Sequence, residues 1–493
     1  MRSSGILLPV ASLPSEYGIG AFSKEAYEFI DLLEAAGQKI WQVLPLGPTG
    51  YGDSPYQSFS TFAGNPYFID LEELIDRGWL TKKECDRVDF GSDASRVDYE
   101  KIYLGRFRLL KKAYRRSGIE NNRAYQNFVK QNAFWLNDYT LFMAIKDANK
   151  GKSFEKWPED LRKHKKAALD GIRKDAKIAE SVGCYAFMQY LFFEQWYKLK
   201  AYANKCGVKI IGDIPIYVAY DSADYWADPK LFQTDKNGTP TGVAGCPPDY
   251  FSATGQLWGN PLYDWPYHKK TGYAWWMKRL GHCFKLYDAV RIDHFRGFDE
   301  YYSIPYGAEN AIGGHWEKGP GYELFDTMKK TLGKRDIIAE DLGYLTESVI
   351  KLVKKTGYPG MKVLEFAFDS NEDNDYLPHN FEKNCVVYTG THDNDTAKGW
   401  YESLSSKDKK YTREYLNVKS AKDIEKALIR LALASTADTA IIPMQDYLGL
   451  GSEGRINTPS TLGGNWSWRM KKSELDIKIA HEIRHLTELY GRG

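Results

Sequence analysis

The chain lacks the cysteine pattern of a disulfide framework or a structural zinc site. Its six cysteines are scattered over 493 residues and form no CxxC pair. Thiols spaced in this way are typical of reduced, buried cysteines in a cytoplasmic protein. No group of residues has the spacing of a calcium loop or a His-rich zinc site. We therefore expect a cytoplasmic protein without disulfides and without a bound metal.

The sequence also lacks a membrane-spanning segment and an excess of either charge. No apolar run reaches the ~18 residues that are needed to cross a bilayer. The apolar start at 5–10 is short and broken by Pro9, so we interpret it as a first strand and not as a signal peptide. With 67 basic and 65 acidic residues, the formal charge is +2. This balance gives no support for a nucleic-acid or anionic-membrane partner, and it leaves the oligomeric state open.

No GxGxxG or Walker-type loop follows an early strand, and there is no internal repeat. The chain instead contains about eight short apolar runs, which alternate with helical patterns such as 23–36, 346–355 and 421–432. Alternating strands and helices predict parallel strands, and eight of them predict an α/β fold, the (β/α)8 TIM barrel. An open doubly wound sheet is the alternative, and the missing nucleotide loop counts against it. The predicted strands are 6–10, 39–44, 209–214, 289–294, 337–341, 362–368, 385–389 and 439–444.

Two gaps between these strands are too long to be simple crossovers. The first contains helical patterns at 99–114, 125–148, 161–179 and 185–206, so we expect an inserted, mostly helical subdomain at 80–180. The second, at 215–287, is rich in Gly, Pro and aromatic residues, and we expect a loop-rich subdomain over the active site. About fifty residues follow the last strand, fewer than the ~100 of a typical domain. We therefore predict a single catalytic barrel over 1–493 without a C-terminal β-sandwich.

Three of the apolar runs end in carboxylates, at Asp293, Glu340 and near Asp393. In a TIM barrel, catalytic residues sit at these carboxyl ends of the strands. Arg291 lies two residues before Asp293 and faces the same side, so it should keep Asp293 ionised, as a nucleophile at a sugar C1 requires. Glu340 has no cationic neighbour in sequence, and desolvation can give it the raised pKa of a general acid. A structural ion pair between Arg291 and either acid is the alternative.

The third acid is either Asp393 or Asp395. Asp393 directly follows His392 at a strand end, where both side chains can hydrogen-bond sugar hydroxyls. Asp395 precedes Thr396 and a short helical pattern, so its simplest role is to cap a helix. We choose Asp393. Neighbouring strands lie ~5 Å apart, so carboxyls on adjacent strand ends can meet the ~5–5.5 Å spacing of a retaining glycosidase pair.

Aromatic residues make up 15% of the chain, and most of them must pack in the core. The segment 245–264 differs, because it mixes aromatic rings with amides and carboxylates, which suit the flat faces and the hydroxyls of sugars. A packed structural loop is the alternative for this segment. Segments 51–60 and 462–469 have the same composition and follow the second and eighth strands, so they should reach the same barrel face. Candidate substrate contacts include Ser54 from segment 51–60, and Asp249, Tyr250 and Phe251 from segment 245–264.

In their order along nearly the whole chain, these segments resemble the amylomaltase family of 4-α-glucanotransferases, or disproportionating enzymes, in the α-amylase superfamily. The segments are GILLPVASLPS, YGDSPYQSFS, GDIPIYV, PPDYFSATGQLWGNPLY, RIDHFRG, AEDLG, GTHDND and GGNWSWR. One departure is Cys246, which stands where an aliphatic residue is expected. The absence of a C-terminal sandwich is also characteristic of this family.

The resemblance implies a cofactor-free enzyme that moves α-1,4-glucan segments between maltooligosaccharides by a retaining double displacement. Asp293 would be the nucleophile, Glu340 the acid/base and Asp393 the stabiliser of the transition state. The sugar contacts that the resemblance implies are Tyr56, Gln256, Trp258, Arg291, His392 and Asn465. Two other functions stay open at this point: an α-glucan hydrolase, and a glucan-binding barrel without turnover.

Overall fold

The computed structural model describes residues 2–50, 52–248, 252–343, 345–369 and 373–493. Eight parallel strands form one sheet in the order β10–β11–β12–β1–β2–β3–β6–β9. Each overlaps one of the eight predicted runs, which confirms the predicted strands and their parallel arrangement. The strands are β1 (Ser3–Leu7), β2 (Ile40–Gln42), β3 (Lys209–Pro215), β6 (Ala289–Asp293), β9 (Ile337–Ala339), β10 (Gly360–Val363), β11 (Cys385–Tyr388) and β12 (Thr439–Pro443).

The sheet curls until its two edge strands meet. The Ala339 N–H at the end of β9 donates a hydrogen bond to the Pro359 carbonyl just before β10, at 2.9 Å. This contact makes the sheet a nearly closed barrel and excludes the open doubly wound alternative. The barrel interior is filled by large apolar side chains from successive strands, as a TIM barrel requires; they include Leu7, Ile40, Ile211, Ile338, Met361, Val386 and Ile441.

Helices surround the barrel and follow the strands. In α1 (Lys24–Ala35), Phe29, Ile30 and Leu33 are buried, and Gly37 just beyond it has a φ of +70°. Ser23 stands at the N-cap, but its side chain makes no capping hydrogen bond to the helix. The helix α18 (Ile477–Leu489) packs against α1 after the last strand. The other barrel helices are α8 (Ala176–Lys205), α11 (Ala274–Leu286), α12 (Tyr322–Leu332), α13 (Glu347–Thr356), α14 (Ala397–Ser403), α15 (Ser406–Leu416), α16 (Ile424–Ala434) and α17 (Met444–Tyr447).

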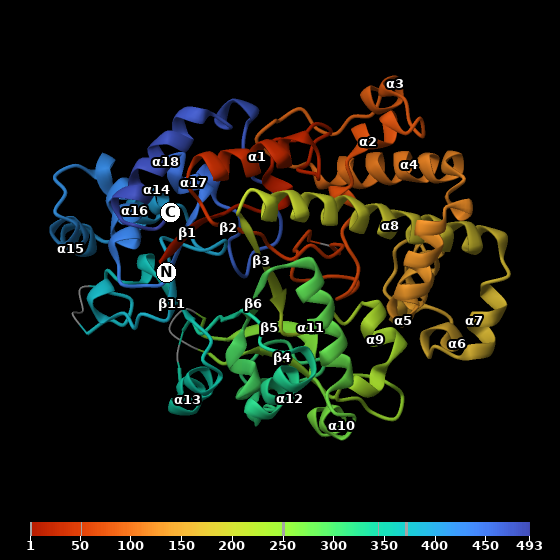
Figure 1. Cartoon of the computed structure of the whole chain (residues 1–493). Coiled ribbons are helices and arrows are strands. Elements are labelled where there is room, and N and C mark those ends of the chain that lie inside the picture. The colour runs from red at the N-terminus through yellow and green to blue at the C-terminus, as the bar shows by residue number, and fades with distance from the viewer. Residues whose placement is uncertain (1, 51, 249–251, 344, 370–372) are drawn as a thin grey trace.

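The long segment between β2 and β3 is mostly helical, and its helices lie on one side of the barrel, opposite α14–α16 (Figure 1). The prediction of a single helix over 161–179 was wrong. Asp175 accepts hydrogen bonds from the amides of Lys177 and Ile178 and so starts a new helix, α8, at Ala176. The helices before it are α2 (Leu71–Asp76), α3 (Lys82–Asp86), α4 (Tyr99–Ser117), α5 (Arg123–Ala148), α6 (Glu159–Arg162) and α7 (Lys166–Ile172).

The segment after β3 holds more regular structure than its Gly and Pro content suggests. It contains α9 (Ala223–Ala227) and α10 (Trp265–Lys270), and it supplies two strands of a second, antiparallel sheet with the order β5–β4–β7–β8. The segment supplies β4 (Gly242–Cys246) and β5 (Gln256–Pro261), and the other two strands of this sheet are β7 (Glu300–Pro305) and β8 (His315–Lys318). Among the described residues, none of the helices is long and apolar enough to span a membrane.

Candidate active site

Three charged side chains meet where β3 and β6 run side by side. Register pairs Asp213 with Arg291 and Pro215 with Asp293. The Arg291 guanidinium donates to Asp213 Oδ2 at 2.6 Å and to Asp293 Oδ1 at 2.9 Å. Arg291 and Asp293 therefore face the same side of β6, as their spacing predicts. On the other face of β3, Gly212 leaves room for the ring of Tyr287, which a Cβ at this position would meet at 2.2 Å.

Glu340 follows β9, the strand next to β6. Ile292 pairs with Ala339 in the register, so Glu340 lies beside Asp293. Its carboxylate accepts two backbone N–H groups, from His294 at 2.7 Å and from Leu342 at 2.9 Å. His294 has a φ of +54°, a left-handed conformation that is uncommon outside glycine. The chain thus turns sharply after Asp293, which aims a backbone amide at the neighbouring carboxylate.

Asp293 and Glu340 are neighbouring carboxyl groups at the ends of adjacent strands. Burial raises the pKa of Glu340 to about 7, and the charge of Asp293 adds to this shift. Burial also raises the pKa of Asp293, which Arg291 opposes. The expected contact of Arg291 with Asp293 is present, and burial opposes the ionised state that this contact favours. Because Arg291 contacts Asp293 and not Glu340, a proton shared by the pair resides on Glu340.

Asp393 lies across the cavity, in the loop after β11. Its Oδ1 accepts the Asn457 amide at 2.6 Å, and its Oδ2 lies 3.3 Å from His392 Nε2. Burial favours the neutral acid, but the charge and hydrogen bond of His392, together with Asn457, hold the pKa of Asp393 below its ordinary value. His392 is 3% exposed, and the ring of Tyr56 stacks on it at 5.1 Å. This wall of the site favours a carboxylate that stays charged.

The rejected acids have structural contacts. Asp395 accepts the Ser452 hydroxyl at 2.7 Å and the Thr396 amide at 2.7 Å, next to the start of α14. The cap of that helix is the Thr396 side chain, which accepts from the Gly399 amide. Asp341 accepts the Met361 amide at 2.7 Å, between β9 and β10. Both observations fit the choice of Asp393 and Glu340 over their neighbours.

A cavity of about 610 Å³ joins Asp293 and Asp393 to most of the predicted sugar contacts, whereas Glu340 and Arg291 are not among its lining residues. Asp293, His392 and Asp393 line its base, and Trp258 meets the ring of His294 edge-on at 4.8 Å. Asn465 binds the Thr458 amide at 2.9 Å and so ties the 458–466 loop over one side. Strand β5 carries the other side. The predicted residues that line the cavity are Ser54, Tyr56, Gln256, Trp258, Asp293, His392, Asp393 and Asn465.

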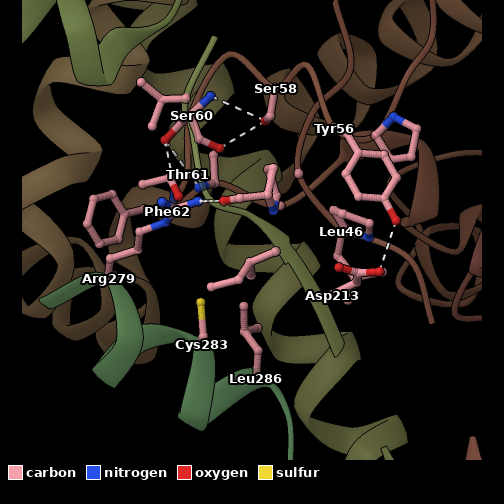
Figure 2. Close-up of a pocket in the computed structure, with 18 of the residues that line it drawn as sticks. Leu46, Tyr56, Ser58, Ser60, Thr61, Phe62, Asp213, Arg279, Cys283 and Leu286 are labelled. Carbon is pink, nitrogen blue, oxygen red and sulfur yellow. Dashed lines mark hydrogen bonds between the residues drawn. The ribbon is translucent and has the colours of Figure 1, made fainter. Parts of the chain in front are cut away.

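Tyr56 lines both this cavity and a smaller one of about 50 Å³, which Figure 2 shows. The Tyr56 hydroxyl donates to Asp213 Oδ2 at 2.9 Å, which connects the loop after β2 to the Arg291 cluster. At the far end of the small cavity, Arg279 donates to the carbonyls of Pro215 and Ile216. The floor of the site is therefore a packed, hydrogen-bonded layer that fixes Tyr56 and Arg291.

Sequence reasoning missed several residues of the site. Asp213 is fully buried and receives both Tyr56 and Arg291, and its only signal was an acid inside the apolar run KIIGDIP. Asn457 and Tyr217 also line the cavity, and neither stands in a pattern that indicates a site. The predicted contacts Asp249, Tyr250 and Phe251 lie outside the described residues.

Asp293, Glu340 and Asp393 accept hydrogen bonds from other groups of the protein. Among the residues that the structure describes, three potential ligands share one place elsewhere: Asp31, Glu34 and Cys206. They lie on α1 and just beyond α8, and their acids are exposed. The arrangement at the barrel mouth is instead suited to acid/base and nucleophilic chemistry on a polar, ring-shaped substrate.

Comparisons with known proteins agree with this geometry. A family model described as 4-alpha-glucanotransferase matches residues 8–475. A 4-alpha-glucanotransferase of Clostridium butyricum is 49% identical over 485 residues, which cover 98% of this chain and 99% of that one. Another, of Streptococcus pneumoniae serotype 4, is 49% identical over 494 residues, with 100% and 97% covered. The solved amylomaltase of Streptococcus agalactiae in complex with acarbose has a TM-score of 0.97 at 41% identity and covers 100% of both chains. The chain therefore belongs to the 4-α-glucanotransferase, or amylomaltase, family of enzymes.

Proposed function

We propose that this enzyme moves α-1,4-glucan segments between maltooligosaccharides by a retaining double displacement. Asp293 is the nucleophile, Glu340 the acid and then the base, and Asp393 the stabiliser of the transition state. One observation carries the assignment. Asp293 and Glu340 sit on adjacent strands, and Arg291 binds only Asp293 of the two. Adjacent strands lie ~5 Å apart, which suits the ~5–5.5 Å carboxyl spacing of retaining enzymes.

In the first step, the Asp293 carboxylate attacks the anomeric carbon and forms a covalent glycosyl-enzyme. Glu340, neutral because its pKa is raised to about 7, donates its proton to the departing glycosidic oxygen. The charge that develops on the sugar ring is positive, and a carboxylate held ionised nearby lowers the energy of that state. Asp393, whose pKa is held low by His392 and Asn457, is suited to this role.

In the second step, the now ionised Glu340 removes the proton from the 4-hydroxyl of an incoming glucan. That oxygen attacks the anomeric carbon and releases Asp293, so the configuration is retained after two inversions. Water at ~55 M competes for the same intermediate, so the acceptor must be held and the intermediate covered. Strand β5, which carries Gln256 and Trp258, and the loop that carries Asn465 provide surfaces around the cavity for this purpose.

The test is incubation with maltotriose, followed by separation of the products and a count of reducing ends. Transfer breaks one α-1,4 bond for each bond it makes. We expect glucose and a ladder of longer maltooligosaccharides, at nearly constant total reducing ends. A hydrolase would raise the reducing ends with each bond cleaved, and a binding barrel without turnover would leave maltotriose unchanged.

The substrate contacts are part of the same proposal. Ser54, Tyr56, Gln256, Trp258, His392 and Asn465 line the cavity, and Arg291 adjoins it through its contact with Asp293. Asp249, Tyr250 and Phe251 are proposed contacts from sequence alone. Replacement of Trp258 by Ala should raise the ratio of hydrolysis to transfer or weaken acceptor saturation. An unchanged ratio and an unchanged acceptor KM would remove Trp258 from the acceptor site.

A further inference from the structure

A second large cavity, of about 740 Å³, lies at the other end of the barrel. Its walls include the first residues of the strands, and the ends of α12 and α13 complete it. None of its lining residues lines the active-site cavity. The strand starts that contribute are Ser3, Ile40, Lys209, Ala289, Ile337 and Thr439.

This cavity gathers positive charge in a chain whose formal charge is only +2. The acidic side chain in its lining is that of Asp336. Two more acids close to the strand starts are already paired, Asp288 with Lys200 at 3.3 Å and Glu382 with Lys354 at 3.1 Å. The cations that line the cavity are Arg2, Lys39, Lys209, Lys329, Lys334, Arg335 and Lys355.

Three of these cations contact other groups of the protein. Arg2 donates to the carbonyls of Leu433, Ser435 and Tyr490. Arg335 donates to the Leu332 carbonyl at 3.0 Å, and Lys355 lies over the ring of Tyr322 at 4.4 Å.

The remaining four are Lys39, Lys209, Lys329 and Lys334, and all four are exposed. None of them takes part in an ion pair found among the described residues. Lys329 is in the last turn of α12, where a cation suits the helix dipole. That reason does not extend to Lys39 and Lys209, which lie at strand starts, or to Lys334, which follows the helix cap Gly333.

Lys39 and Lys209 are held together by the sheet. The Lys209 N–H donates to the Lys39 carbonyl at 2.9 Å, and Lys209 pairs in register with Ile40. Lys209 is two residues before Ile211, which packs in the barrel interior, so its side chain leaves β3 on the interior side. The lysine therefore starts on the interior side of β3, and its exposed side chain lines the cavity.

The rest of the cavity is suited to an organic molecule. Its apolar floor is formed by Ile40, Ile211, Ile338 and Val386, each at most 8% exposed. Aromatic side chains stand beside the floor, and small polar side chains close it. A volume of 740 Å³ is in the range of sites for cofactors and metabolites and far larger than a single inorganic anion needs. The aromatic and polar members are Tyr322, Phe325, Tyr358, Ser3, Asn384 and Thr439.

We propose that this cavity binds a phosphate ester of sugar or nucleotide size. The phosphoryl group pairs with Lys39, Lys209 and Lys334, and the organic part lies against the apolar floor and the tyrosine rings. Lysine is a common phosphate ligand, and a charge-assisted contact of this kind is stronger than a neutral one. The site is independent of the glucan-transfer chemistry, because it shares no residue with the active-site cavity.

The experiment is isothermal titration calorimetry of the full chain with four probes, without divalent metal: ATP, glucose 6-phosphate, tripolyphosphate and inorganic phosphate. We expect saturable binding of ATP or glucose 6-phosphate at one site per chain, at least tenfold tighter than inorganic phosphate. The affinity should fall as NaCl rises from 50 to 300 mM, since exposed charges are screened. The preferred ester identifies the class of organic group, and tripolyphosphate measures the contribution of charge alone.

The variant Lys209→Gln/Lys334→Gln should weaken binding at least tenfold and leave maltotriose turnover unchanged. Lys39→Gln/Lys334→Gln is a second variant that tests the same phosphoryl contacts without a change in β3. The matched control is Lys130→Gln/Lys236→Gln, which removes two exposed lysines outside the cavity and should bind like the wild type. Three results would overturn the proposal: no saturation by either ester, equal affinity for inorganic phosphate and both esters, or equal loss in the control.

Discussion

The two sides of the active site shift the pKa values of their acids in opposite directions. We call them the β6–β9 wall, with Glu340, and the wall after β11, with Asp393. On the β6–β9 wall, burial raises the pKa of Glu340 to about 7, and the nearest guanidinium is turned toward Asp293. On the wall after β11, His392 and Asn457 bind Asp393 and hold its pKa below the ordinary value. Burial raises the pKa of both acids, so burial alone does not explain the difference.

The difference comes from the partners that each carboxylate accepts. Glu340 receives two neutral backbone amides, which offset only part of the cost of desolvation. Asp393 receives a side-chain amide and faces an imidazole whose own pKa it raises. One wall is thus suited to hold a proton and the other to hold a charge, and this division is what a double displacement needs.

The largest loss of activity should follow replacement of Asp293, the proposed nucleophile. Asp293→Asn keeps the shape of the side chain and its contact with Arg291 but removes the nucleophile. We expect maltotriose disproportionation to fall by about 10⁵–10⁶-fold, as for other covalent nucleophiles. The initial rate of product formation measures this, and the melting temperature checks the fold. A loss below tenfold in a folded variant would place the nucleophile elsewhere.

The proton-holding wall is tested by Glu340→Gln. Maltotriose turnover should fall by about 10²–10⁴-fold, the usual contribution of a general acid. An α-maltosyl fluoride needs no protonation to leave, so its fluoride release in the first turnover should fall by less than about tenfold. Equal losses for both substrates would reduce Glu340 to a structural role.

The charge-holding wall is tested by a pair of neighbours. Asp393→Asn removes the proposed stabilising charge, and we expect kcat to fall by about 10²–10³-fold. Asp395→Asn is the matched control on the same loop, because Asp395 binds Ser452 and the Thr396 amide. Its kcat should stay within about threefold of the wild type. The reverse order of losses would mean that the wrong acid was chosen.

The barrel strands could be predicted from sequence because each is a short apolar run buried on both faces. The ends of three of those runs also identified Asp293, Glu340 and the Asp393 loop. The second sheet could not be found in this way. Its strand β4, GVAGC, has two glycines, and it pairs with β7, about sixty residues later. Glycine is weak in strands, and such a pairing leaves no local signal.

The same limit applies to the partners of the acids. Asn457 reaches Asp393 from 64 residues further along the chain, and no periodicity indicates it. Asp213 stood in a quoted segment, but its contact with Arg291 joins two strands 78 residues apart in sequence. Sequence therefore predicted the reacting groups that we propose, whereas the groups that contact them are visible only in three dimensions.

The smallest expected loss of activity comes from replacement of Asn457, a residue that contacts a proposed reacting group and does not itself react. Asn457→Ala removes one hydrogen bond to Asp393 and leaves the carboxylate in place. In the wild type the pKa of Asp393 is held low, so its charge is lost only at strongly acidic pH. Without Asn457 this pKa rises toward the ordinary value, and the charge is lost at a higher pH as the pH falls. At pH 7 we expect only a few-fold loss in kcat/KM.

The pH profile of kcat/KM for maltotriose separates the two walls in this variant. The alkaline limb follows Glu340, which must be protonated to act as the acid, so activity is lost as the pH rises through about 7. Asn457 does not contact Glu340, and this limb should not move. The acid limb should become steeper, because the loss of the Asp393 charge then approaches the loss of the Asp293 charge, whose pKa burial raises. The matched control is Ser452→Ala, which removes one hydrogen bond from Asp395 and should shift neither limb. A profile in which both limbs move together would show that the two walls are coupled through the shared cavity and do not set their protonation states independently.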